Sequence, residues 1–187
     1  MSEVVEPQNE FKRQLLATIP SLRAFAASLC GQYDRADDLV QETVVKAWTK
    51  QESFELGTNI KAWLFTILRN EFYSQMRKKG REVSDPDGHY TSQLSIHPNQ
   101  YGSMDMKDFM KALDQIGEEQ REAIVLVCAS GFSYEEAAEI CGCAVGTIKS
   151  RINRARGRLQ ELLGIDNEDE FGPDANSSAV VRQSFAV

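Results

Sequence analysis

Apolar residues recur with helical spacing through two long stretches of the chain, and a polar stretch separates them. The first stretch covers residues 10–81 and the second covers residues 104–164, and neither shows the alternation typical of β-strands. The pattern therefore predicts an all-α protein with two small helical domains. Residues 82–103 are rich in Pro, Gly, Ser, Asn and Asp, which predicts a flexible linker. Residues 165–187 are acidic, then small and polar, and are expected to form a mobile tail.

About four helices are expected in the first domain. The pattern delimits three of them, which run from Phe11 to Cys30, from Arg35 to Lys50, and from just after Thr58 to about Lys79. In the second of these helices Asp38, Gln41 and Glu42 point away from the apolar face. An acidic turn of this kind is usually a solvated face. Its alternative role is to bind a basic protein surface, because it cannot bind DNA.

The second domain contains a helix-turn-helix pattern between Ser133 and Arg158. Ser133 and Glu136 have the spacing of a capping box, and Gly142 stands where a left-handed helix end is common. The next helix has one apolar stripe, made of Ile148, Ile152, Ala155, Leu159 and Leu162. A short helix that braces a second, basic helix is the arrangement that enters a DNA major groove. The alternative is an ordinary helical hairpin with a solvated basic face.

The polar residues of this second helix are candidates for contacts with nucleic acid. Arg151 and Arg154 are placed to reach base edges or phosphates, and Thr147 and Ser150 are short enough to let the backbone approach. Arg156 and Arg158 lie further along the helix, where phosphate contacts are expected, and Lys149 lies on the opposite flank.

The helix from Asn59 to Arg81 interleaves aromatic residues with cations. Single-stranded nucleic acid stacks its bases on aromatic rings while cations follow its backbone. The aromatic residues are Trp63, Phe65, Phe72 and Tyr73, and the cations are Lys61, Arg69, Arg77, Lys78, Lys79 and Arg81. The alternative is that Trp63, Phe65 and Phe72 belong to the core, whereas Arg69, Asn70 and Tyr73 are expected to be exposed.

The net charge of −7 argues against a nucleic-acid partner until its distribution is considered. Six cations face one anion between Ile60 and Arg81, and five face one between Gly142 and Leu163. These two basic patches predict two separate contacts with phosphate backbones. The acidic residues lie mainly elsewhere, in the first residues, in the Asp34–Glu55 stretch and in the tail.

Composition also narrows the class of protein. No apolar run is long enough to span a membrane, and the acidic first residues do not form a secretory signal, so a cytoplasmic protein is expected. Cys128 is expected in the core, and the Cys141–Cys143 pair lacks the partners of a zinc site. The only histidines, His89 and His97, lie in the predicted linker without a nucleophile or phosphate loop, so neither an enzyme nor a cofactor is expected.

Three segments, in this order, resemble the sigma-70 family of bacterial transcription initiation factors, and most closely its extracytoplasmic-function (ECF) group. They are DDLVQETVVKAW, NIKAWLFTILRNEFYSQMRKKGR and SYEEAAEICGCAVGTIKSRINRARGRL. Within that group the chain is similar to the EcfG-type general stress sigma factors. The resemblance covers about residues 10–81 and 104–164. It implies a probable monomer that binds core RNA polymerase, promoter DNA and a NepR-like anti-sigma factor, with a PhyR-like regulator that releases it.

The resemblance also implies a role for each surface. Polymerase binding, at the clamp helices of the β′ subunit, falls to Asp37, Asp38, Gln41 and Glu42. Contacts with the minus-10 promoter element fall to Asn59, Lys61, Trp63, Arg69, Asn70, Tyr73, Arg77 and Lys78, and the loop from Gln51 to Asn59 captures a flipped base. Contacts with the minus-35 element fall to Thr147, Lys149, Ser150, Arg151, Arg154, Arg156 and Arg158.

Two other functions remain open at this point. A stand-alone helix-turn-helix regulator would need a dimer to bind paired half-sites, and it would leave the first domain unexplained. A decoy that only binds an anti-sigma factor would have no use for Arg151, Arg154 or the cations from Arg77 to Arg81.

Overall fold

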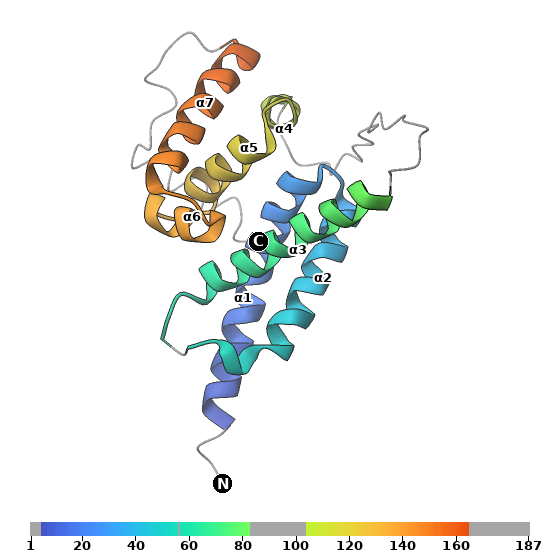
Figure 1. Cartoon of the computed structure of the whole chain (residues 1–187), viewed down its shortest axis with the longest axis vertical. Coiled ribbons are helices and arrows are strands. Elements are labelled where there is room, and N and C mark those ends of the chain that lie inside the picture. The colour runs from blue at the N-terminus through green and yellow to red at the C-terminus, as the bar shows by residue number, and fades with distance from the viewer. Residues whose placement is uncertain (1–4, 56, 83–103, 165–187) are drawn as a thin grey trace. The chain divides into compact units, whose positions relative to one another are not determined.

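The structure is a computed structural model that describes residues 5–55, 57–82 and 104–164. Those residues form helices and turns without any β-strand, so the all-α prediction is confirmed. The chain divides into two compact units, Met1–Ile96 and His97–Val187 (Figure 1). The predicted linker from residue 83 onward, the two histidines within it and the tail lie outside the described residues. Within the described part, no helix is both long and apolar enough to cross a membrane.

The first unit is a bundle of three helices in which each helix packs on the other two. Its helices are α1 (Val5–Cys30), α2 (Tyr33–Thr49) and α3 (Ile60–Glu82), with a short 3-10 turn, η1 (Gln51–Ser53), after α2. In Figure 1, α3 crosses both α1 and α2. The described part of this unit therefore contains three α-helices rather than the four expected, and α1 begins at Val5 instead of Phe11.

The core of the first unit lies where the three helices meet. Phe25 of α1 and Phe65 of α3 are fully buried and stack with ring centroids 4.9 Å apart. Around them lie the buried residues Leu22, Ala26, Leu39, Val40, Leu64 and Leu68. This core fixes which face of α2 and which face of α3 remain available to partners.

A second aromatic group fastens the segment after α2 to the bundle. The Phe54 ring lies 5.8 Å from Phe11 and 5.3 Å from Trp63, and the Phe11 ring lies 6.4 Å from Trp48, measured between centroids. Aromatic pairs at such separations add stability beyond the area they bury. The loop that follows Phe54 is therefore anchored beside the start of α3.

Polar contacts tie α2 to α3 on the opposite side of the aromatic residues' helix faces. Lys46 forms an ion pair with Glu71, and Gln75 Nε2 donates to Glu42 Oε2 at 2.9 Å. The hydrogen bond from Lys46 is the largest influence on Glu71 and holds the pKa of its carboxyl below the ordinary 4.5, although partial burial opposes this effect. The carboxyl is mostly buried, whereas Lys46 is half exposed.

Replacing Glu71 with glutamine is expected to make the stability of the chain less dependent on pH. Since the pKa of Glu71 is lowered by folding, its ionised form contributes stability above the ordinary pKa of 4.5, and that contribution is lost as the pH falls through the lowered pKa. We expect the wild-type chain to exceed Glu71→Gln by about 1 kcal/mol near neutral pH, with the difference vanishing in acid. Urea unfolding at several pH values measures it. Glu52→Gln, at an exposed position in η1, is the control, and an equal pH dependence in both variants would contradict the role of Glu71.

The second unit is organised around one long helix. Its α-helices are α4 (Met104–Asp114), α5 (Glu118–Ile124), α6 (Tyr134–Cys141) and α7 (Val145–Leu163), and α4, α5 and α6 all pack on α7. Leu113, Ile124, Leu126 and Ile140 are buried with the apolar stripe of α7. Because every other helix of this unit contacts α7, the orientation of its polar side is fixed by the whole domain.

Cys128 lies on the surface and not in the core, which corrects the expectation from its apolar neighbours. After Ile124 the helix widens into a π-helical turn, η2 (Val125–Ala129). A π turn has a longer hydrogen-bond step than an α-helix, so residues beyond it no longer follow the 3.6-residue phase. Val125 and Leu126 are buried, whereas Cys128 faces solvent.

Candidate functional site

The helix-turn-helix is formed by α6, a short turn and α7. Ser133 Oγ accepts a hydrogen bond from the Glu136 amide at 3.1 Å, and Glu136 Oε2 accepts one from the Ser133 amide at 2.9 Å, so the predicted capping box is present. Gly142 ends α6 with φ of 63°, in the left-handed region that favours glycine. These local signals determine where α6 begins and ends, and α7 follows after two residues.

The apolar stripe of α7 faces the core as predicted. Ile148, Ile152, Ala155 and Leu159 are buried, while Leu162 near the helix end is half-buried. Anchoring one side in this way turns the remaining side outward. That outer side carries all seven α7 residues that were expected to contact DNA.

Four of these seven residues line one cleft of about 400 Å³ against the start of α5. On the α7 side the cleft is lined by Thr147, Ser150, Arg151 and Arg154, and on the α5 side by Gly117, Glu118, Glu119 and Gln120. We call it the α5–α7 cleft. Ser150 Oγ donates to the Thr147 carbonyl at 2.9 Å, and Arg154 is exposed. The two candidates for base contacts, Arg151 and Arg154, therefore lie together at one opening.

Arg151 is not freely exposed, which the sequence did not indicate. Only 15% of its side chain is exposed, and Nη2 forms an ion pair with Glu119 Oε2 at 2.7 Å. Its other terminal nitrogen, Nη1, lies 3.7 Å from the sulfur of Cys143. Glu119 and Arg151 are far apart in the sequence and meet only because α5 packs on α7, so no short-range pattern could have revealed the pair.

The remaining three cations of α7 lie outside the cleft. Lys149 is exposed, with its ammonium 5.8 Å from the centroid of the Tyr134 ring. Arg158 donates to Glu161 at 2.8 Å, and Arg156 is half-buried. Their spread along the helix suits contacts with phosphates on either side of a groove, which position a protein without specifying sequence.

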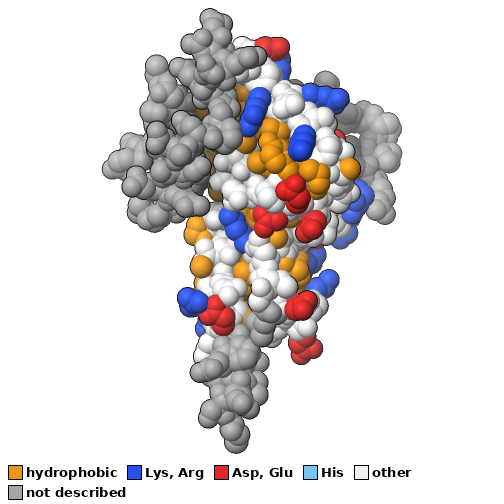
Figure 2. All heavy atoms as spheres, turned by 90° about the vertical axis from the view of Figure 1, so that its left-hand side faces the viewer, with side chains coloured by type: hydrophobic (Ala, Val, Ile, Leu, Met, Phe, Trp, Pro, Cys, Tyr) orange, Lys and Arg blue, Asp and Glu red, His pale blue; other side chains and the backbone are white. Residues whose placement is uncertain are grey.

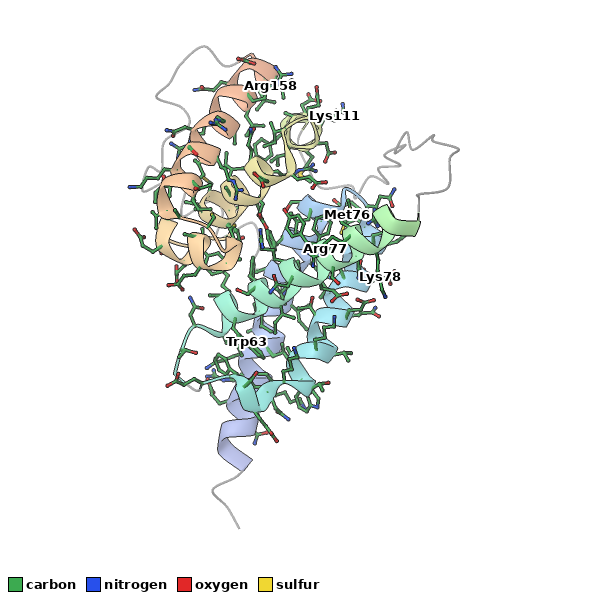
Figure 3. All side chains as sticks on the ribbon, viewed as in Figure 1. Trp63, Met76, Arg77, Lys78, Lys111 and Arg158 are labelled. Atoms are coloured by element: carbon green, nitrogen blue, oxygen red, sulfur yellow. The ribbon has the colours of Figure 1, made fainter. Side chains whose placement is uncertain are left out.

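The aromatic and basic residues of α3 divide between the core and the surface. Phe65 and Phe72 are buried, so for these two the core alternative is correct. Trp63 is half-buried, because its ring packs 6.2 Å from Phe11. The cations Arg77 and Lys78 near the end of α3 are exposed, as is the neighbouring Met76 (Figure 3).

The other predicted contacts along α3 are already engaged in local interactions. Asn59 Oδ1 accepts a hydrogen bond from the Ala62 amide at 3.1 Å and so caps the helix. The guanidinium of Arg69 lies 4.7 Å from the centroid of the Tyr73 ring, and the Lys61 ammonium lies 5.8 Å from that of Phe65. Asn70 is exposed. The Arg69–Tyr73 pair therefore presents a cation and an aromatic ring together.

The outer face of α2 combines acidic and apolar side chains. Asp38, Gln41 and Glu42 are exposed, as the helical pattern predicted. Asp37 is held by Arg23 of α1 through two hydrogen bonds of 2.8 and 3.0 Å, so its carboxylate also serves the bundle. Sequence analysis missed that Val45 and Trp48 extend the same face, with 64% and 48% of their surface exposed. Their spacing from Gln41 was the available signal.

The charges are finely divided rather than gathered into one field. Figure 2 shows acidic side chains next to basic ones on the face it draws, with hydrophobic side chains between them. In the α5–α7 cleft the same mixture occurs, with Arg151 and Arg154 facing Glu118 and Glu119. Close cation–anion neighbours of this kind weaken long-range attraction for phosphate.

Comparisons with known proteins agree on one family. Residues 16–82 match Sigma-70 region 2, and residues 106–159 match Sigma-70, region 4. The chain is 55% identical over 173 residues to the ECF RNA polymerase sigma factor EcfG of Rhodopseudomonas palustris (strain TIE-1), which covers 92% of this chain and 96% of that protein. Over 143 residues it is 34% identical to the ECF RNA polymerase sigma factor SigE of Mycolicibacterium smegmatis, covering 74% of this chain and 55% of that protein.

Two solved structures are similar as well. One is the sigma factor RpoE in complex with the anti-sigma factor NepR from Bartonella quintana, with a TM-score of 0.79 and 65% identity over 84% of this chain and 99% of that one. The other is CnrH in complex with the cytosolic domain of CnrY, with a TM-score of 0.62 and 27% identity over 86% of this chain and 91% of that one.

Proposed function

Because the chain belongs to the ECF group of the sigma-70 family of RNA polymerase sigma factors, we propose how its surfaces divide the work of starting transcription. A sigma factor directs polymerase to promoters, so it needs a surface for polymerase and surfaces for DNA. The observation that carries the proposal is the α5–α7 cleft, where four residues of α7 lie together on the side opposite its buried stripe.

The second unit contacts the minus-35 element through α7. The helix enters the major groove, where Arg154 and Arg151 reach base edges and the short side chains of Thr147 and Ser150 allow close approach. Lys149, Arg156 and Arg158 bind phosphates and set the register of the helix on the duplex. Arg151 must exchange Glu119 for DNA in this step.

The first unit contacts the minus-10 element through α3 and the loop before it. Arg77 and Lys78 bind the DNA backbone, because both are exposed near the end of α3. Arg69 and Tyr73 offer a cation and a ring for stacking, Asn70 is exposed beside them, and Lys61 lies near the helix start. Trp63 and Asn59 act mainly by fixing the loop that receives a flipped base, since one packs on Phe11 and the other caps α3.

The outer face of α2 binds the clamp helices of the polymerase β′ subunit. Asp38, Gln41 and Glu42 provide charge complementarity to a basic surface, and Val45 and Trp48 add apolar area at the same interface. Asp37 contributes by holding α2 to Arg23 as well as by its charge. An acidic docking surface also explains why the protein is acidic overall.

Asp38→Lys is expected to weaken association with core RNA polymerase about 10-fold or more. Reversing an exposed charge at a complementary interface removes an attraction and introduces a repulsion. Transcription from a genomic promoter library by core polymerase plus the chain should fall in parallel, and a pull-down of core polymerase measures the association directly.

Glu52→Lys, which makes the same charge change in η1 and off the α2 face, is the matched control and should keep wild-type association. Unchanged polymerase binding by Asp38→Lys would remove α2 from the interface. Failure of the wild-type chain to start any transcript with core polymerase would oppose the whole scheme.

Control by a NepR-type anti-sigma factor is part of the proposal. Its support is the 65% identity to the sigma factor of the RpoE–NepR complex together with the similarity to EcfG. In this scheme the chain is a cytoplasmic polymerase subunit without enzymatic activity of its own, and it serves genes of the general stress response.

A further inference from the structure

The ion pair between Glu119 and Arg151 places an acidic residue inside the DNA-binding surface itself. Arg151 Nη2 and Glu119 Oε2 are 2.7 Å apart, and the arginine side chain is 15% exposed while the glutamate is 68% exposed. Both residues line the α5–α7 cleft with Thr147, Ser150 and Arg154. The carboxylate therefore faces solvent on the side from which a phosphate or a base edge would approach.

We propose that Glu119 is a specificity-determining residue that competes with DNA for the Arg151 guanidinium. In the free chain it occupies one edge of the arginine and repels phosphate, so that Arg151 contributes little to binding of arbitrary DNA. This inference rests on the proposed contact of α7 with the promoter.

The competition discriminates because the two kinds of DNA offer different replacements. An ion pair with a well-exposed carboxylate is weak, so a good acceptor can displace it. A guanine edge accepts two parallel hydrogen bonds from one arginine, which is among the commonest specific contacts. A single phosphate in non-specific DNA offers no such fit and also meets the negative charge of Glu119. The pair therefore penalises non-specific contacts more than the correct one.

The neighbouring residue Glu118 provides a matched control. It lines the same cleft and is exposed, but the described residues include no ion-pair partner for it. Glu118→Gln and Glu119→Gln thus remove the same charge from the same region, and only Glu119→Gln also removes the ionic partner of Arg151. Any difference between the two variants reports the pair rather than the charge.

The test measures binding of the full-length free chain to a labelled duplex of random sequence at low salt. Glu119→Gln is expected to bind about three- to fivefold more tightly than wild type, and Glu118→Gln less than about twofold more tightly. Arg151→Ala should abolish the difference, so that Glu119→Gln and Glu118→Gln have equal effects in the Arg151→Ala background. Circular dichroism of each variant verifies that the helices are intact.

Three outcomes would overturn the inference. Equal gains from Glu119→Gln and Glu118→Gln would mean that only the charge matters. A gain from Glu119→Gln that persists in the Arg151→Ala background would mean that Arg151 is not the target of Glu119. Weaker binding by Glu119→Gln would assign Glu119 to orienting Arg151 on DNA instead.

Failure of the proposed function has a different signature. If α7 does not bind the promoter, Arg151→Ala in an otherwise wild-type chain leaves promoter-dependent transcription by the polymerase complex unchanged. If Arg151→Ala reduces that transcription while Glu119→Gln matches Glu118→Gln, the promoter contact stands and the competition does not.

Discussion

Arg154→Ala is expected to reduce transcription from the promoters of this sigma factor about 10- to 100-fold while leaving its association with polymerase unchanged. Arg154 is exposed at the α5–α7 cleft, and among the described residues it has no ion pair to offset its loss. A specific arginine–base contact contributes about 1–3 kcal/mol, and 1.4 kcal/mol corresponds to tenfold. In vitro transcription with saturating core polymerase measures the effect.

Arg158→Ala is the control for that experiment. Arg158 lies one turn further along α7, outside the cleft, and is paired with Glu161 at 2.8 Å. Its removal deletes the same kind of side chain but only a backbone contact, so a loss of less than about fivefold is expected. An equal loss from both variants would mean that Arg154 supplies charge rather than sequence recognition, and lost polymerase binding by Arg154→Ala would contradict its assignment to DNA.

Phe65→Ala is expected to destabilise the first unit by about 3–5 kcal/mol. The Phe65 ring is fully buried and stacks on Phe25 at 4.9 Å, so truncation leaves a cavity at the meeting point of all three helices. Such a loss approaches the whole stability of a small domain. Urea unfolding followed by circular dichroism gives the change.

Asn70→Ala serves as the surface control on the same helix. Asn70 is exposed, so its replacement should change the free energy of unfolding by no more than about 0.5 kcal/mol. If Phe65→Ala were equally mild, the ring would not be a core residue. It would then return to the set of side chains available for stacking with DNA.

The parts of this fold that sequence predicted well are those set by neighbouring residues. Ser133 and Glu136 are three positions apart, and Gly142 acts through its own backbone angle, so both ends of α6 can be inferred from a few letters. The buried stripe of α7 likewise follows from the spacing of Ile148 and Ile152 within one helix.

The parts that sequence did not predict depend on contacts between distant segments. Arg151 is covered by Glu119 of α5, and Asp37 is held by Arg23 of α1, so two side chains expected at the surface are partly occupied within the protein. Cys128 was misplaced for another reason. Its helix changes phase at the π turn, and a regular 3.6-residue pattern cannot reveal that change.

The aromatic group beside α3 has a practical consequence for spectroscopy. The chain contains two tryptophans, Trp48 and Trp63, and both belong to the first unit. Both rings lie near that of Phe11, at 6.4 and 6.2 Å between centroids. Intrinsic tryptophan emission of the free chain therefore reports the melting of the three-helix bundle alone and is silent about the helix-turn-helix. Comparing it with the far-ultraviolet signal of all helices shows whether the two halves of the molecule unfold together or in sequence.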